Sequence, residues 1–363
     1  MKERPVPIRY DKKGNPYWDS ELSKPDNSVA VAMMVPDRII PVIFVPGVMG
    51  SNLRGSKPET RDVSWRLDGL TSLKPWMGRG AKRRKETLQP QLMEVDNEGL
   101  IPSGTQQDNE ELKRRGWGEV GKFSYGEFLV WLENTLNDYD NPHGGVRDSL
   151  IGSVLQAEKG EAALTKEEVG LSYRYRFPVY ACGYNWLDSN AISSIQLQTR
   201  IEEIIERYRK ARKKCEKVII VTHSMGGLVA RHCSQVLGME EKIFGIVHGV
   251  MPAIGAAATY RRMKAGTENP GGGMGGWFAG YMTSKALGED AAEMTAVLST
   301  APGPLQLLPT REYGNGWLQI KNGAQENFLP KHNDPYTEIY TARGEWWGLC
   351  EDHLVNPLNR EKD

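Results

Sequence analysis

The chain has 363 residues, enough for one large α/β domain with an appended cap. Lys plus Arg and Asp plus Glu number 46 each, so no overall charge steers the protein toward nucleic acid or anionic lipid. The polar N-terminus lacks the apolar stretch of a cleaved signal, and no later run approaches the ~18 apolar residues of a membrane span. The four cysteines lack metal-like spacing, which indicates synthesis in the cytoplasm; neither a metal nor a cofactor is expected.

The first 254 residues divide into an arm and an alternation of strands and helices. Residues 1–36 are rich in Pro, Lys, Asp and Asn without a hydrophobic period, and we interpret them as a polar N-terminal arm. Residues 37–254 predict a doubly wound, mostly parallel α/β sheet with polar insertions. The expected elements are strands at 38–45, 177–182, 217–221 and 242–248, and helices at 125–136, about 192–213 and after residue 224.

Two further expectations concern the surfaces of these elements. The apolar stripe of the long helix is expected to comprise Ile192, Ile195, Ile201, Ile204, Ile205 and Tyr208. The basic clusters at 82–85 and 113–115 are expected to lie on solvated loop faces.

The alternation ends at residue 254. Residues 255–310 are expected to form a cap or lid, because the Gly-rich stretch 271–276 is followed directly by Trp277, Phe278 and Tyr281. A mobile apolar lid would meet a lipid or an acyl chain, and an ordered cap packed on its own core is the alternative. Residues 311–363 are interpreted as the C-terminal part of the same α/β domain, which we expect to be incomplete.

The most informative segment is K-V-I-I-V-T-H-S-M-G-G-L-V-A-R-H-C at 217–233. Its β-branched run, its serine and the helical pattern that follows are typical of a nucleophile elbow, in which a strained turn lifts the serine hydroxyl clear of the sheet. Gly226 meets the need for a small residue after the serine, whereas Thr222 stands where Gly is commonest before it. The segment predicts a catalytic Ser224 and an α/β-hydrolase fold, and a plain turn with an idle serine is the alternative.

An acyl-transferring serine requires backbone N–H groups that stabilise the developing oxyanion. The N–H of Met225 is the expected first donor, because it directly follows the nucleophile. The loop P-G-V-M-G at 46–50 follows the first predicted strand of the alternation, and Val48 or Met49 is the expected second donor.

The serine also requires a histidine base and a carboxylate, in the chain order Ser, acid, His. Of the later histidines, His232 and His248 are expected to be structural, and His332 falls in a turn. His353 fits the order best as the base.

The acid is less well defined, with Asp334 and Asp290 as candidates. Residues 337–341 are the only late segment that predicts a strand, so acid and base cannot lie on separate loops after it. The spacing therefore predicts that the relay is unfinished within these residues.

Four motifs carry a resemblance to lipases of the lecithin-cholesterol acyltransferase-like branch of the α/β-hydrolases. They are V-I-F-V-P-G-V-M-G-S-N-L (42–53), G-Y-N-W (183–186), T-H-S-M-G-G-L-V-A-R (222–231) and A-P-G-P-L-Q-L-L-P (301–309). Asn185 departs from the usual Asp of that branch. R-G-W-G-E-V (115–120), the Gly-rich stretch and Y-G-N-G-W-L-Q-I-K (313–321) are most similar to antibacterial lipase effectors of the type VI secretion system, third class.

The resemblance implies phospholipid hydrolysis in the periplasm of a rival cell, an immunity protein in the producing cell and loading onto a secretion spike protein. Contact with a membrane surface would come through the substrate. Two alternatives remain: an acyltransferase on the same scaffold, and a non-catalytic hydrolase fragment that acts as a binding partner.

Overall fold

The computed structural model describes residues 2–6, 8–11, 15–18, 28–32, 36–69, 72, 76, 80–138, 145–155, 160–266, 291–323 and 325–355. The expected lid residues Trp277, Phe278 and Tyr281 lie outside these ranges, as does Asp290. No helix within them has the length and apolar character that crossing a bilayer requires.

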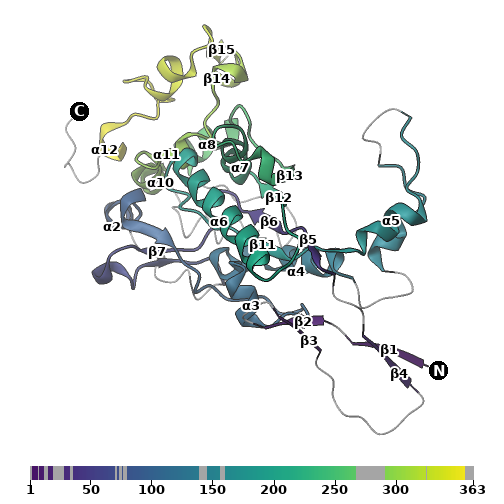
Figure 1. The fold of residues 1–363 in the computed structure, drawn as a ribbon. Helices are drawn as coiled ribbons and strands as arrows, with labels where there is room; N and C mark the ends of the chain where they lie inside the picture. The colour runs from purple at the N-terminus through teal and green to yellow at the C-terminus, as the bar shows by residue number, and fades with distance from the viewer. Residues whose placement is uncertain are drawn as a thin grey trace.

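A parallel sheet forms the centre of the described part, and Figure 1 shows helices packed around it. Its strand order is β11 (Val179–Ala181), β6 (Val42–Val45), β12 (Val218–His223) and β13 (Ile243–Gly249), and every neighbouring pair is parallel. The chain crosses from β11 to β12 through α6 (Asn190–Lys210) and from β12 to β13 through α7 (Gly226–Gln235). The predicted doubly wound parallel sheet is confirmed.

The two faces of the sheet belong to two hydrophobic cores. In β6, Ile43 and Val45 pack in the core that includes α6 and α7, whereas Val42 and Phe44 pack in a second core with α4 (Lys122–Leu136). This alternation follows from the period of two in a strand, and a continuous apolar run is what a sheet buried on both faces requires.

The remaining elements surround this centre. The other strands are β1 (Lys2–Val6), β2 (Ile8–Tyr10), β3 (Pro16–Trp18), β4 (Ser28–Ala32), β5 (Arg38–Ile39), β7 (Leu53–Gly55), β8 (Ser64–Trp65), β9 (Met93–Val95), β10 (Tyr175–Arg176), β14 (Leu318–Asn322) and β15 (Gln325–Leu329). The other helices are α2 (Ala81–Thr87), α3 (Asn109–Arg114), α5 (Lys166–Ser172), α8 (Ala257–Ala265), α10 (Ala291–Leu298), α11 (Pro302–Leu305) and α12 (Asp352–Val355).

Two expectations about secondary structure were wrong in detail. In α6, Ile192 and Ile195 are 55% and 52% exposed, because the buried face of its first turns is polar (Asn190, Ser193 and Ser194) and becomes apolar only at Leu197. The late segment expected as a strand is instead a π-helix, Tyr336–Tyr340, and the late strands are β14 and β15, which pair antiparallel.

The basic clusters were expected in solvent, and part of each is buried. Arg84 donates to the carbonyl of Trp76 at 3.0 Å, and Lys85 donates to the carbonyl of Val355 at 2.7 Å. Arg115 is fully buried and bonds Glu111 and Glu133 at 2.7 and 3.0 Å. Lys85 and Arg115 thus join segments that are 270 and 18 residues apart, and the local sequence does not reveal such contacts.

Candidate active site

Ser224 lies at the tip of a strained turn between β12 and α7. Its φ of +49° is in the left-handed region that non-glycine residues rarely adopt. The turn is held by hydrogen bonds from the Ser224 N–H to Gly249 O, at 2.8 Å, and from the Gly227 N–H to Ser224 O, at 2.9 Å. The residue is partly exposed at the carboxyl end of the sheet, as an elbow requires.

The side after the serine is the crowded side of this turn. A Cβ added at Gly226 would lie 2.4 Å from Pro46 O, and one at Gly227 would lie 2.6 Å from the Met251 side chain. Thr222, before the serine, is buried, and its hydroxyl has a partner in His248 Nδ1 at 3.0 Å. The departure at this position is therefore compatible with the elbow.

The loop at 46–50 lies against Ser224. A Cβ added at Gly47 would be 3.2 Å from Ser224 Cβ, and Met49 has a φ of +64°. Among the described residues, the N–H groups of Val48, Met49 and Met225 donate to no protein acceptor. Met225 is also the N-cap of α7, whose N-terminal dipole favours negative charge at this position.

Asn52 anchors the segment that follows this loop. It is fully buried, and its side-chain amide donates to the carbonyls of Gly118 and Val120 at 2.9 and 3.2 Å. Its backbone N–H donates to Glu119 O at 2.7 Å, and its side-chain oxygen accepts from the Leu67 N–H at 3.2 Å. The motif R-G-W-G-E-V thus holds the segment that follows the loop at 46–50.

The G-Y-N-W motif supports the same loop from β11. The Tyr184 hydroxyl donates to Pro46 O at 2.9 Å, and the Tyr184 N–H donates to Ser51 Oγ at 3.0 Å. Asn185 Nδ2 donates to the carbonyls of Pro90 and Met93 at 2.8 and 3.0 Å. A carboxylate cannot donate these bonds, so the amide of Asn185 suits this position, where the resemblance leads us to expect Asp.

A further contact joins the loop to the elbow, and the sequence did not reveal it. Tyr125 Oη in α4 accepts from the Gly47 N–H at 3.1 Å and lies 3.0 Å from His223 Nδ1. Burial raises the pKa of the Tyr125 hydroxyl to about 12 and lowers the pKa of the His223 imidazole. Both groups are therefore neutral near pH 7.

The structure places the expected histidines as follows. His232 Nδ1 lies 2.8 Å from Ser194 Oγ on α6, and His248 on β13 lies 3.0 Å from the Thr222 hydroxyl on the neighbouring strand β12, so both have structural partners. The N–H of His332 donates to Glu338.

The expected base and acid contact residues other than Ser224. His353 lies in α12 with a side chain that is 77% exposed and 4.0 Å from Glu351. In Figure 1, α12 lies near α2 and α10 and apart from β12. Asp334 pairs with Arg311 at 3.1 Å and accepts from Thr337 at 2.8 Å.

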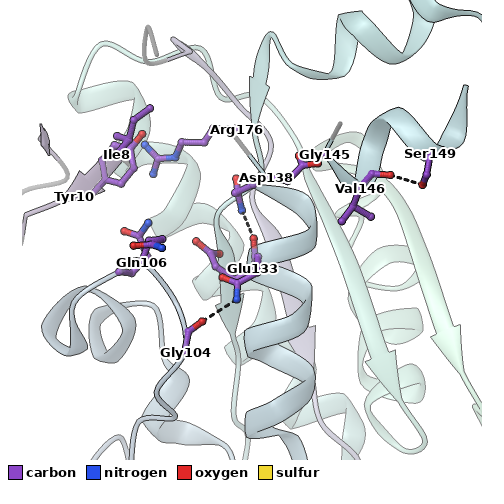
Figure 2. A pocket seen from close by; sticks show the side chains of 13 residues that line it. Ile8, Tyr10, Gly104, Gln106, Glu133, Asp138, Gly145, Val146, Ser149 and Arg176 are labelled. Carbon is purple, nitrogen blue, oxygen red and sulfur yellow. Dashed lines mark hydrogen bonds between the residues drawn. The ribbon is translucent and has the colours of Figure 1, made fainter. Parts of the chain in front are cut away.

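A cavity of about 600 Å³, shown in Figure 2, lies at the amino end of the sheet, opposite to the end that carries the elbow. Glu133, which lines it, accepts from the Val179 N–H at the start of β11. In the cavity wall, the Arg176 guanidinium lies 3.4 Å from the centre of the Tyr10 ring. The elbow lies at the carboxyl ends of the strands, where parallel α/β sheets bind their substrates. This cavity is therefore separate from the elbow. No cluster of three potential metal ligands occurs in the described ranges.

A parallel sheet with a strained serine elbow and a facing loop of free N–H groups defines the α/β-hydrolase class of fold. Comparison with known proteins agrees. The model of the PGAP1-like alpha/beta domain family matches residues 192–262, which include the elbow. No curated protein matches the chain.

Among solved structures, the chain is similar to one described as "The crystal structure of Tle4-Tli4 complex". The match has a TM-score of 0.74 and 31% sequence identity, and it covers 90% of this chain and 67% of that one. The chain therefore belongs to the lipase-like α/β-hydrolase family of Tle4, a type VI lipase effector. The α/β-hydrolase recognition is confirmed, whereas placement in the third effector class stays a prediction.

Proposed function

We propose that the chain is a serine esterase of the lipase type that hydrolyses phospholipid through an acyl-enzyme on Ser224. The observation that carries the proposal is the juxtaposition of the strained Ser224 with the loop of Gly47, Val48 and Met49. In the proposed reaction, the Ser224 hydroxyl attacks the ester carbonyl, and the N–H groups of Met225 and of Val48 or Met49 stabilise the oxyanion.

The proposal extends to delivery and partners. Membership in the family of a type VI effector supports secretion by that system into the periplasm of a target cell. The matched structure is a complex with Tli4, which supports a corresponding immunity protein for this chain. Loading onto a spike protein remains part of the proposal.

A non-catalytic role is the second candidate. It is favoured by one observation: in the described part of the chain, His353 and Asp334 contact Glu351 and Arg311 rather than Ser224. An acyltransferase differs from a hydrolase only in whether an alcohol or water accepts the acyl group, and product analysis with added alcohol separates the two.

The test is hydrolysis of phospholipid vesicles and of a soluble p-nitrophenyl ester by the chain and by Ser224→Ala. A working serine relay predicts that the substitution lowers kcat by on the order of 10⁶. Gly170→Ala is a matched control, because a Cβ at Gly170 meets nothing within 4 Å. Equal hydrolysis by wild type and Ser224→Ala would favour the binding role.

A further inference from the structure

One tyrosine joins the two halves of the candidate site. Tyr125 is 98 residues from His223 in the sequence, yet its hydroxyl contacts both His223 and Gly47. Gly47 lies in the loop at 46–50 that carries the proposed oxyanion donors (the oxyanion loop), and His223 directly precedes Ser224. The Tyr125 ring packs against Phe44 at 4.9 Å and edge-on to His223 at 5.7 Å between ring centres, so packing fixes the position of the hydroxyl.

The hydrogen bonds of this hydroxyl favour one tautomer of the histidine. The Tyr125 oxygen accepts from the Gly47 N–H, so its single hydrogen is available to His223 Nδ1. An Nδ1 that accepts carries no hydrogen, which leaves the hydrogen of the neutral ring on Nε2. Protonation of His223 would place hydrogens on both nitrogens and remove this acceptor.

Little space separates the loop from the elbow at this point. A Cβ at Gly47 would lie 2.8 Å from His223 Nδ1 and 3.2 Å from Ser224 Cβ. A shift of the loop therefore changes the distance between Ser224 and the N–H groups of Val48 and Met49.

We propose that Tyr125 is a positioning residue that fixes the oxyanion loop relative to Ser224 and holds His223 in its Nε2–H form. Tyr125 acts through Gly47 and His223. Its effect on turnover rests on the proposed ester hydrolysis, whereas its effects on the His223 tautomer and on the Gly47 N–H do not.

The experiment compares Tyr125→Phe, which keeps the ring and removes the hydroxyl, with wild type and with Tyr260→Phe. The control removes a buried hydroxyl that donates to Trp347 O at 2.7 Å in another part of the chain. Imidazole ¹⁵N NMR reports the tautomer of His223, and amide hydrogen exchange reports the Gly47 N–H. Steady-state kinetics on a p-nitrophenyl ester give kcat and KM separately.

We expect wild-type His223 to be in the Nε2–H form and Tyr125→Phe to contain both tautomers, with faster exchange at Gly47. In a hydrolysing chain, kcat should fall about 10- to 100-fold with KM nearly unchanged, because misplaced oxyanion donors affect the transition state. Tyr260→Phe should match wild type in all three measurements.

Three results would overturn the inference: an Nδ1–H tautomer in wild type, unchanged tautomer and exchange in Tyr125→Phe, or equal effects of Tyr260→Phe. The His223 tautomer in wild type is measured without a variant. Neither imidazole ¹⁵N NMR nor amide exchange at Gly47 requires that the chain be catalytically active. Inactivity of wild type would therefore count against the proposed function, while the spectra would still decide the role of Tyr125.

Discussion

Adding one methyl group at Gly47 tests whether the loop and the elbow act together. In Gly47→Ala, the new carbon would lie 2.8 Å from His223 Nδ1 and 3.2 Å from Ser224 Cβ. Favourable contact distances begin at about 3.5 Å, so the loop must retreat by about 0.3 to 0.7 Å. Displaced donors should lower kcat about 100-fold, because misplacement on the order of 1 Å can cost that much and removal of a donor costs somewhat more.

The assay is ester hydrolysis with thermal unfolding measured in parallel. Gly170→Ala, in the middle of α5, controls for replacement of a glycine and should keep kcat, with stability raised by about 0.5 to 1 kcal/mol. The reasoning would be refuted by a Gly47→Ala protein that folds normally and turns over at the wild-type rate. A loss confined to KM would also refute it, since oxyanion donors stabilise the transition state.

Three further predictions concern stability. Arg115→Leu leaves the buried carboxylate of Glu133 without its cation and Glu111 with Arg114 alone, and it should lower the free energy of unfolding by about 3 to 5 kcal/mol; a urea-unfolding loss below about 1 kcal/mol would disagree. Asn185→Asp loses two donated hydrogen bonds and should cost about 1 to 3 kcal/mol in the same assay, whereas an increase in stability would argue against the donor role. The pKa of His223 is lowered in the fold, so the unfolded chain takes up its proton first, and stability should fall as the pH drops below about 6.5. His223→Gln should weaken this acid dependence, and identical pH profiles for the two proteins would contradict the shift.

Local patterns predicted the centre of the molecule well. The apolar runs of β6 and β12 specify buried parallel strands, and the turn after β12 specifies an elbow, because each signal lies within about ten residues. The loop at 46–50 followed from the rule that the second oxyanion donor comes from an earlier strand, and the structure places Gly47 beside Ser224.

Contacts between distant segments were not predictable. Lys85 appears as part of a solvated basic cluster, yet it bonds a carbonyl 270 residues away. In the sequence, Tyr125 is only the first residue of a predicted helix. The contacts of its hydroxyl with Gly47 and His223 depend on how α4 packs against both the loop and the elbow. The segment 337–341 is β-branched and aromatic in part, but its backbone forms a π-helix with Ile339 and Tyr340 buried.

The central claim is that the Ser224 hydroxyl is a nucleophile facing an oxyanion site. It is tested most directly by incubating the chain with a fluorophosphonate probe and locating the adduct by mass spectrometry. The account predicts a covalent adduct on Ser224 that is absent in Ser224→Ala and formed more slowly in Gly47→Ala. An unmodified Ser224 in folded protein, or an adduct formed equally fast in Gly47→Ala, would contradict it.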